Sequence, residues 1–403
     1  MKIIFLNRFF CPDHSATSQL LTDLAFYLAN SGRPVTVITS RQRIDAPKAE
    51  LPDREQINGV AVYRVWTTSS SRASITGRAL DYFTFYIFAG WRLFRLCRAG
   101  DVVVAKTDPP LISVIAALVT KVRKAKQVNW LHDLFPEVAI SLGVGALSGW
   151  VGRMLRRVRN WSLKSARVNV VLGRRMAAVL KSEGVDPDRI TIIHNWCDGQ
   201  TIRPLSRSRN TLRKSWRLGD AFVVMYSGNL GRAHEFKEIV QAARMLKQRS
   251  DIIFLIVGDG VKRSWLEAEI IRRGLRNIRL EGYQPRERLG ESLSAGDVHL
   301  VSLRPELEGL IVPSKFYGVA AAGRPTLFIG SSEGEIARIL EQAKCGLTVS
   351  PGDGEALSKK IVDLAADPDG RKAMGRAARK VFEQRFDRPI ALAAWRDVLT
   401  GVS

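Results

Sequence analysis

Glycine-rich turns that follow short apolar runs are the residues of this sequence best suited to chemistry. The first turn, Gly228-Asn229-Leu230-Gly231, precedes a helical pattern, and the turns Gly258-Asp259-Gly260 and Gly282-Tyr283 end the next two expected strands. Glycine lets a backbone approach a phosphate closely, and a helix N-terminus offers free N–H groups. One such turn could need glycine for geometry alone, but three along one sheet edge predict a nucleotide-sized binding strip.

A lysine stands at the start of an expected helix further along the chain. Ser314 and Lys315 follow a stretch of acids and a turn of Gly and Pro. A positive charge at a helix N-terminus opposes the helix dipole and costs roughly a few tenths of a kcal/mol unless an anion is bound. We interpret Lys315 as a ligand of a diphosphate. The alternative is an exposed lysine beside a turn.

A histidine follows an expected strand in the first half of the chain. His132 and Asp133 lie within the run Trp130 to Glu137, and a Pro136 turn comes after them. A histidine at a strand end can be a structural residue. Its acidic neighbour and its position at the edge where open sheets bind ligands favour an active-site role.

Metal-binding patterns are weak in this sequence. Asp-x-Asp occurs at Asp186-Pro187-Asp188 and Asp367-Pro368-Asp369, where Asp and Pro are typical turn residues. The four cysteines lie far apart, which indicates neither a disulfide framework nor a zinc site and fits a reducing setting. We expect a site that uses no metal and no cofactor.

Short β-branched runs alternate with longer amphipathic stretches twice over. The expected strands are 3–6, 35–39, 60–66, 102–106, 128–131, 168–172 and 190–194, then 222–226, 252–257, 278–280, 298–301, 326–329 and 347–349. Apolar strands separated by helices predict parallel sheets covered on both faces. We expect an α/β protein of two Rossmann-like domains that face each other across a ligand-binding cleft.

The length of 403 residues suits two or three domains, and 46% hydrophobic residues exclude disorder as the main description. We expect an N-terminal domain at residues 1–198, a linker rich in Ser and Arg at 199–220, and a C-terminal domain at 221–384. The last segment, 385–403, is expected to form a helix that packs back on the N-terminal domain.

Taken in order, the turn at Gly228–Gly231, the turn at Gly258–Gly260, the Glu308-Gly309 pair and the Ser314-Lys315 pair resemble the retaining family 4 glycosyltransferases of the GT-B fold. The resemblance spans nearly the whole chain. In the first half of the chain, the motifs around His14 and His132 resemble those of the family members that build bacterial surface polysaccharides on a lipid carrier.

The resemblance implies a role for each matching residue. His132, with Asp133 beside it, would look onto the transferred sugar, and Glu308 would face the donor sugar. The donor nucleotide sugar would contact Gly228, Asn229, Gly231, Arg232, Gly258, Gly260, Gly282, Tyr283, Ser314 and Lys315. The acceptor would be approached by His14, Ser15, Ala16, Thr17 and Ser18.

The sequence departs from the family pattern at two places. The family carries an Arg and a Lys on the donor diphosphate where this chain has Asn229 and His234, so we expect Arg232 and Lys315 to supply the charge. The glutamate that normally holds the ribose aligns with Gly318. Possible replacements for it are Glu333 and Glu335.

The chain is strongly basic, with 62 Lys and Arg against 39 Asp and Glu and a net charge of +23. The excess gathers near Arg92–Arg98 and Arg153–Arg175, with an aromatic run at Tyr82–Trp91 that is too short to span a bilayer. Such segments could be solvated helix faces, a nucleic-acid surface, or a surface for anionic lipid. We favour a peripheral protein on the inner face of the cell membrane, which binds no nucleic acid.

Together these features predict a retaining, metal-independent hexosyltransferase. Its donor would be a nucleotide sugar, expected to be a UDP-sugar, and its acceptor a lipid-linked saccharide of surface polysaccharide or O-antigen biosynthesis. Two alternatives remain: a GT-B-fold sugar-nucleotide epimerase, and a non-enzymatic basic protein that binds nucleic acid.

Overall fold

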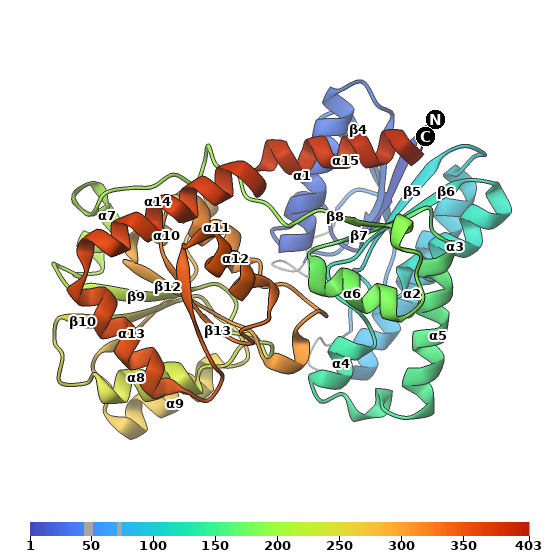
Figure 1. Ribbon diagram of the computed structural model, residues 1–403. Coiled ribbons are helices and arrows are strands. Elements are labelled where there is room, and N and C mark those ends of the chain that lie inside the picture. Colours follow the sequence, from blue (N-terminus) through green and yellow to red (C-terminus); the bar gives the residue numbers. More distant parts are fainter. Residues whose placement is uncertain (44–50, 71–74, 403) are drawn as a thin grey trace. The chain divides into compact units, whose positions relative to one another are not determined.

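The computed structural model describes residues 1–43, 51–70 and 75–402. Its contacts divide the chain into two compact units, one of residues 1–193 with 392–403 and the other of residues 194–391 (Figure 1). Each unit contains one sheet of largely parallel strands with helices packed against it. The predicted α/β class is therefore confirmed.

The sheet of the first unit has the strand order β3-β4-β2-β1-β5-β6-β7-β8. Its strands are β1 (Ile3–Leu6), β2 (Val35–Ser40), β3 (Arg54–Ile57), β4 (Val60–Val65), β5 (Val102–Lys106), β6 (Lys126–Trp130), β7 (Val168–Val171) and β8 (Ile190–Ile192). The parallel neighbours β1, β5 and β6 end at the same edge. Segments that follow these three strands are thereby brought together.

The expectation of purely parallel sheets is wrong at one edge, where β3 runs antiparallel to β4. This strand has no apolar run, because it reads Arg-Glu-Gln-Ile and alternates between exposed and half-buried positions. It is held instead by its backbone ladder and by an ion pair between Glu55 and the buried Arg64 of β4. A polar edge strand of this kind leaves little hydrophobic signal in a sequence.

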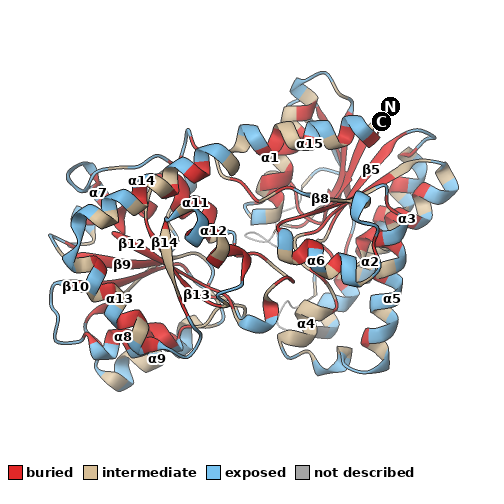
Figure 2. Ribbon diagram, viewed as in Figure 1, coloured by how far each residue is buried: buried red, intermediate tan, exposed pale blue. Residues whose placement is uncertain are grey.

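Helices of the first unit supply the apolar layers that cover its sheet. They are α1 (Ala16–Asn30), α2 (Ile75–Leu96), α3 (Ile112–Arg123), α4 (Glu137–Ser141), α5 (Trp150–Ser165) and α6 (Arg174–Ser182). Phe85, Ala89 and Leu93 recur every fourth residue of α2, so they share one buried face, which packs with β1 and β5 in a single core. The buried strands and the exposed outer faces of the helices are visible in Figure 2.

The sheet of the second unit is parallel throughout, in the order β11-β10-β9-β12-β13-β14. Its strands are β9 (Phe222–Ser227), β10 (Ile252–Val257), β11 (Ile278–Glu281), β12 (Val298–Ser302), β13 (Thr326–Ile329) and β14 (Gly346–Val349). Because β9, β10 and β11 are consecutive in the sheet, the three glycine turns that follow them are neighbours at its carboxyl edge.

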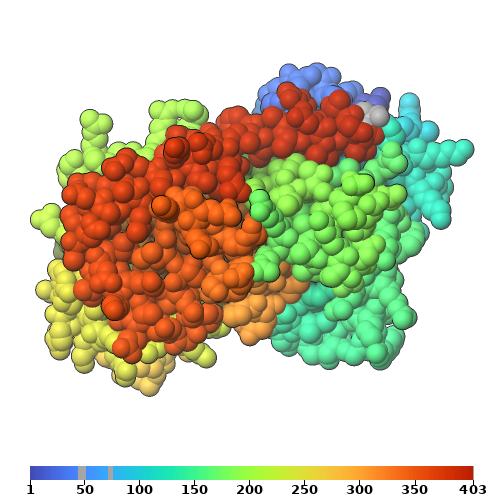
Figure 3. Space-filling model, in the orientation of Figure 1, coloured from blue at the N-terminus to red at the C-terminus, as the bar shows by residue number. Residues whose placement is uncertain are grey.

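The helices of the second unit are α7 (Thr211–Ser215), α8 (Lys237–Met245), α9 (Arg263–Arg273), α10 (Leu289–Ala295), α11 (Lys315–Ala321), α12 (Glu335–Ala343), α13 (Gly354–Ala366) and α14 (Pro368–Arg385). The C-terminal residues, red in Figure 3, cover the face of this unit that is turned toward the viewer. The segment 199–220, which the sequence suggested as a linker, contains α7 and is part of this unit. Its Arg213 is buried and donates a hydrogen bond to the Ala295 carbonyl at 2.7 Å.

The last helix, α15 (Arg388–Val402), begins in the second unit and ends in the first. Within the first unit, Trp395 of α15 packs against Trp130 at the end of β6, with ring centroids 4.6 Å apart. Both indole side chains are buried. The C-terminus therefore contributes directly to the layer beneath His132.

Candidate active site

The glycine turns of the second unit pack backbone against backbone. We call residues Gly228–Gly231, for which the sequence predicts donor binding, the donor loop. Gly228 has φ +124° and Gly258 has φ +140°, conformations that side chains rarely adopt. A Cβ on Gly258 would lie 2.2 Å from the Gly228 carbonyl oxygen, so no larger residue fits. Glycine at these two positions therefore allows the turns after β9 and β10 to touch.

Hydrogen bonds fix the donor loop and leave some donors available. Gly228 N–H donates to Val257 O at 2.9 Å, and Leu230 N–H donates to Asp259 O at 2.8 Å. Within the described part of the chain, the N–H groups of Asn229 and Gly231 donate no hydrogen bond. Two backbone N–H groups of the loop thus remain available as hydrogen-bond donors to an anion.

Lys315, the first residue of α11, lies against the donor loop. A Cβ on Gly228 would come within 2.7 Å of Lys315 Cε. The Lys315 ammonium lies 5.2 Å from the centre of the Tyr226 ring, and burial lowers the pKa of Lys315 to about 8. Lys315 is half-buried rather than an exposed lysine beside a turn, so that alternative is wrong.

His234 holds the Lys315 side chain in place. Lys315 Nζ and His234 Nε2 are 2.8 Å apart, and His234 Nδ1 is 2.6 Å from the Ser302 carbonyl oxygen. Because an ammonium only donates, Nε2 is the acceptor and Nδ1 carries the proton that it donates to Ser302. Burial, with the charge of Lys315, lowers the pKa of His234 to about 3. His234 is therefore neutral and adds no charge at the loop.

The other residues that were predicted to bind the donor occupy varied positions. Arg232 is exposed and makes no hydrogen bond or ion pair with the described residues, and Ser314 is exposed at the N-cap of α11. The hydroxyl of Tyr283, which follows Gly282, donates to Asp259 O at 3.2 Å. The structure thus brings Tyr283 to the Gly258–Gly260 turn.

One residue at this turn, Arg263, was not predicted from the sequence. Arg263, the first residue of α9, donates from Nη1 to Gly258 O at 2.7 Å and from Nε to Glu267 at 2.9 Å. It braces the turn after β10. The available signal was its position in the first turn of the helix that follows a Gly-Asp-Gly sequence.

Glu308 is fixed by the start of α12. Its Oε1 accepts a hydrogen bond from the Glu335 N–H at 2.9 Å. The two candidate ribose ligands differ, since Glu335 is buried there and Glu333 is exposed. Gly318 is buried within α11, where a Cβ would lie 3.2 Å from Leu293 Cδ1. The position therefore has little room for the glutamate usual in the family.

In the first unit, His132 lies at the carboxyl edge of the sheet beside a buried lysine. Lys106, the last residue of β5, has its ammonium 3.5 Å from the centre of the Trp130 ring and donates to Thr17 O at 2.9 Å. Thr107 accepts a hydrogen bond from His132 N–H at 3.1 Å and also contacts the Asp133 carboxyl group. Residues after β5 and β6 thus form one polar cluster.

Burial dominates the electrostatics of this cluster. It lowers the pKa of His132 well below the usual range, with help from the Lys106 charge. Burial also raises the pKa of Asp133 to about 7, with Asp108 adding to the rise, and the pKa of Asp108 to about 6. Among the described residues, His132 Nε2 and Asp133 Oδ1 have no hydrogen-bond partner although both atoms are buried. These two polar atoms could therefore form hydrogen bonds with a ligand.

The segment His14–Ser18 joins this cluster at the start of α1. Ser15 caps the helix by accepting from Ser18 N–H at 3.4 Å. The Thr17 side chain contacts Asp108, while His14 and Ala16 are exposed. The structure therefore brings the predicted acceptor segment to the same sheet edge as His132.

Lys106 and Asp108 are the members of this cluster that the sequence analysis missed. Their signal is a charged residue that ends the otherwise apolar run Val102–Lys106, followed by a Thr-Asp-Pro turn.

The Asp-x-Asp segments serve as turns and caps. Asp186 accepts from Asp188 N–H at 3.1 Å, and Asp367 caps α14 by accepting from Gly370 N–H at 2.8 Å. Across residues 1–43, 51–70 and 75–402, no group of three or more His, Cys, Asp or Glu side chains is arranged to hold a metal ion. In the same part of the chain, no helix has the length and apolar character needed to cross a bilayer.

Known sequences match both halves of the chain. A model described as glycosyl transferase 4-like domain matches residues 17–196, and one described as glycosyl transferases group 1 matches residues 208–381. The probable glycosyltransferase WbjE of Pseudomonas aeruginosa is 30% identical over 329 residues, 80% of each chain. The putative colanic acid biosynthesis glycosyl transferase WcaI of Escherichia coli is 23% identical over 414 residues, the full length of both.

Solved structures match the whole chain as well. The Anabaena protein HepE in complex with UDP has a TM-score of 0.75 at 15% identity and 100% coverage of both chains. Sucrose-phosphate synthase from Thermosynechococcus elongatus has a TM-score of 0.79 at 16% identity, covering 100% of this chain and 99% of that one. At such identities the likeness concerns the fold.

Proposed function

This chain belongs to the family 4 type glycosyltransferases of the GT-B fold, and from that premise we propose which sugar transfer it performs. The proposed donor is a UDP-sugar and the proposed acceptor is a lipid-linked saccharide of surface polysaccharide or O-antigen biosynthesis. The transfer is proposed to retain the anomeric configuration and to need no metal.

The observation that carries the proposal is the position of Lys315 at the donor loop. A diphosphate at the loop would meet the N–H groups of Asn229 and Gly231 and the Lys315 ammonium. A desolvated cation that contacts the neutral His234 ring and the Tyr226 ring is suited to bind an anion. UDP is the nucleotide named for the HepE complex, which supports uridine as the base.

These groups suit sugar transfer from a nucleotide. The glycosidic bond breaks through an oxocarbenium-like transition state while negative charge grows on the departing diphosphate. Lys315 and the donor-loop N–H groups would stabilise that charge, so the proposed reaction draws its neutralising charge from the protein. In the first unit, neutral His132 offers the Nε2 atom that has no partner among the described residues as a hydrogen-bonding group for sugar. Glu308 is proposed to face the donor sugar.

Relatives support the proposed acceptor class. The Escherichia coli protein is named for colanic acid biosynthesis, and LpsD of Rhizobium meliloti, which is 28% identical over 224 residues, is named for lipopolysaccharide core biosynthesis. A lipid-linked acceptor would have to be reached at the bilayer, so we propose that this protein works peripherally on the cytoplasmic face of the membrane.

The surface of the first unit is consistent with lipid contact. Helix α3 packs between α2 and α5, and all three carry exposed apolar side chains. On α2 they include Phe83 and Trp91, which are 59% and 61% exposed, and on α5 Trp150 is 69% exposed. Trp and aromatic residues with nearby Arg are typical of interfacial helices.

Part of the positive charge near α5 is already neutralised within the protein. Arg156 and Arg159 both pair with Glu137, at 2.9 and 2.8 Å. Arg153 and Arg157 are exposed, and neither pairs with another described residue. The proposed lipid-facing charge of α5 is therefore assigned to these two arginines.

The testing experiment is a transfer assay with a panel of UDP-, GDP- and ADP-sugars, each with and without a polyprenyl-diphosphate-linked saccharide. We expect the sugar to move to the lipid acceptor only from a UDP-sugar, with retained configuration and unchanged rate in a chelator. Loss of activity in chelator with recovery in Mg²⁺ or Mn²⁺ would disprove metal independence. An isomerised nucleotide sugar formed without acceptor would indicate the epimerase instead.

A further inference from the structure

A second cavity lies in the second unit, at the opposite edge of the sheet from the donor loop. Asp297 and Arg324 line it, and they precede β12 and β13, whereas the donor loop follows the carboxyl end of β9. The cavity has a volume of about 670 Å³ and is lined by seven basic side chains but only two acidic ones. That volume lies within the range of small-molecule sites.

Both acidic residues of the cavity already have partners. Asp297 pairs with Arg207 at 2.6 Å and with the buried Arg213 at 3.4 Å. It also accepts a hydrogen bond from Val223 N–H at 2.8 Å. Glu383 pairs with Arg379 at 2.7 Å. The cavity therefore holds an excess of positive charge that these two carboxylates do not balance.

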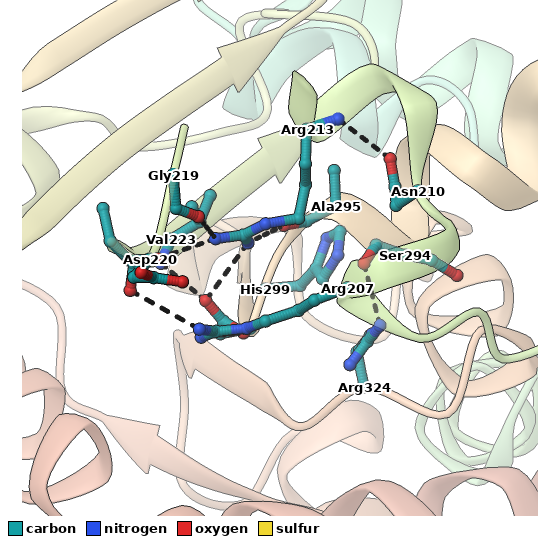
Figure 4. A network of polar contacts seen from close by, with 12 residues as sticks. Arg207, Asn210, Arg213, Gly219, Asp220, Val223, Ser294, Ala295, His299 and Arg324 are labelled. Atoms are coloured by element: carbon teal, nitrogen blue, oxygen red, sulfur yellow. Dashed lines mark hydrogen bonds and ion pairs between the residues drawn. The ribbon is translucent and has the colours of Figure 1, made fainter. Parts of the chain in front are cut away.

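Arg324 is a positively charged residue of this cavity, and it lies beside Ser294 in the polar network of Figure 4. Its Nη2 donates to two carbonyl oxygens, Leu205 O at 2.7 Å and Ser294 O at 2.8 Å. Its Nε is buried and has no hydrogen-bond partner among the described residues. Burial lowers the pKa of Arg324. The charge of Asp297 opposes this change, whereas the smaller effects of Arg207 and Arg213 add to it. A guanidinium in this situation gains from a bound oxyanion.

The outer wall of the cavity is a basic face of α14. Arg376 and Lys380 are one helical turn apart, so they share a face. Both are exposed, and neither makes a hydrogen bond or ion pair with the described residues. The cavity lining thus includes two exposed cations in addition to the less exposed Arg324.

The same wall contacts the helix that carries Lys315. Arg379 of α14 donates from Nη1 to Ala321 O at 2.7 Å, and Ala321 is the last residue of α11. A Cβ on Gly375 would lie 2.4 Å from Gly323 O, so α14 and the end of α11 meet at their backbones. The wall of the cavity is therefore in contact with the end of the helix whose first residue is Lys315.

We propose that this cavity is a second anion site, which binds a small soluble ligand carrying a diphosphate group and is separate from the donor loop. The site is assigned by its charge, its volume and the Arg324 Nε atom, and it does not depend on the proposed sugar donor or acceptor.

The test is titration of the full-length protein with inorganic diphosphate, followed by calorimetry at two salt concentrations. The double variant Arg376→Gln/Lys380→Gln removes the outer cations, and because both side chains are exposed we expect its melting temperature to be unchanged. Lys315→Met removes the donor-loop cation. Lys359→Gln, an exposed position on α13 outside the cavity, is the matched control.

We expect the dissociation constant for diphosphate to be at least tenfold higher in the double variant than in the wild type. Added salt should raise the dissociation constant of the wild type more than that of the double variant, and Lys359→Gln should behave as the wild type. A binding event that survives in Lys315→Met and is lost in the double variant supports the second site. Binding that is lost in Lys315→Met and kept in the double variant, or no binding of diphosphate by any of these proteins, overturns the proposal.

Discussion

Lys315 donates a hydrogen bond from Nζ to the neutral ring of His234, with the two nitrogens 2.8 Å apart. The lysine thus has its charge held by an uncharged acceptor, and the acceptor is itself held by the Ser302 carbonyl. At position 234 the resemblance implies a lysine on the donor diphosphate, whereas this chain has a neutral histidine that accepts a hydrogen bond from Lys315. We therefore expect Lys315, and not residue 234, to supply positive charge at the donor loop.

A pH dependence of donor binding follows from the Lys315 pKa of about 8 in the free protein. Below that pH the ammonium is already charged, and above it binding of a diphosphate must take up a proton. We expect the affinity for UDP to be flat up to about pH 7.5 and then to weaken by up to about tenfold per pH unit. Calorimetry from pH 7 to 9.5, in buffers that differ in ionisation enthalpy, measures both the affinity and the proton uptake.

Lys315→Met is expected to weaken UDP binding by about 10- to 100-fold at pH 7, the range for loss of a charge-assisted hydrogen bond. The remaining binding should not vary above pH 8. Arg232→Gln is the comparison, because Arg232 is exposed and its charge is screened by solvent, so we expect a loss of about threefold or less. If the two variants lose the same affinity, Lys315 has no special role.

Gly228→Ala tests the packing between the donor loop and Lys315. The added Cβ would lie 2.7 Å from Lys315 Cε, and a flexible side chain can move away from it. We expect the loss of UDP affinity from Gly228→Ala to shrink at least threefold in a Lys315→Ala background. The two changes are coupled because they share one contact.

Gly258→Ala is the control for that cycle. Its added Cβ would lie 2.2 Å from the Gly228 backbone carbonyl, which no side-chain truncation relieves. We expect Gly258→Ala to be equally harmful in both backgrounds. If Gly228→Ala reduces the UDP affinity by the same factor in both backgrounds, backbone strain alone, and not contact with Lys315, explains its effect.

Asp133→Asn is expected to stabilise the protein and lower its activity. Burial raises the pKa of Asp133 from 3.8 to about 7, so between those pH values the native state binds more protons than the unfolded state. The wild-type stability therefore falls as pH rises through this window. Asparagine cannot ionise, so the variant does not lose this stability. We expect its free energy of unfolding to exceed that of the wild type by as much as about 4 kcal/mol above pH 7 and not at all near pH 3.

Urea unfolding at pH 4, 6 and 8 measures this difference. Asp369→Asn provides the control, since that carboxyl side chain is 90% exposed and its replacement should not change the pH profile. A stability gain for Asp133→Asn that is the same at all three pH values would mean that the buried charge is not its cause.

Most of the fold could be predicted from the sequence because its strands are continuous apolar runs between helices. All of the strands expected from such runs are present, and several, such as Val102–Lys106 and Ile252–Val257, have the expected ends. The polar strand β3 was missed because edge pairing does not require an apolar pattern. The segment 199–220 was not recognised as part of the domain because it lacks an apolar period. Buried hydrogen bonds of Arg213, rather than a hydrophobic face, attach it to the second unit.

The site could be predicted in part. The glycines of the donor loop and Lys315 were recognisable, since close approach of backbones leaves glycine as the choice and a lysine at a helix start is unusual. The cluster of Lys106 and Asp108 was not found, because only the three-dimensional neighbourhood of β1, β5 and β6 brings these groups to His132. Likewise, the neutral state of His234 depends on burial and on Lys315, and neither is visible from the residue type.

The exposed aromatic residues of α2 predict binding to anionic membranes. We expect the protein to sediment with vesicles that contain phosphatidylglycerol and to bind them more weakly in high salt, because each exposed Arg near the surface contributes about 1 kcal/mol. Phe83→Ser/Trp91→Ser should lose most binding at any salt concentration, since it removes apolar area. Ile271→Ser in the second unit removes an apolar side chain that is even more exposed, at 81%, and should bind as the wild type does.

The arginines of α5 should affect the same assay in a different way. Arg153→Gln/Arg157→Gln removes two exposed charges, so we expect it to abolish much of the salt dependence and leave the weak binding to neutral phosphatidylcholine unchanged. Arg159→Gln is a contrasting variant, because Arg159 is buried against Glu137 and its loss should lower the melting temperature rather than the electrostatic part of binding. Equal retention of the wild type on neutral and anionic vesicles would disprove the electrostatic role of this surface, whatever the aromatic variants show.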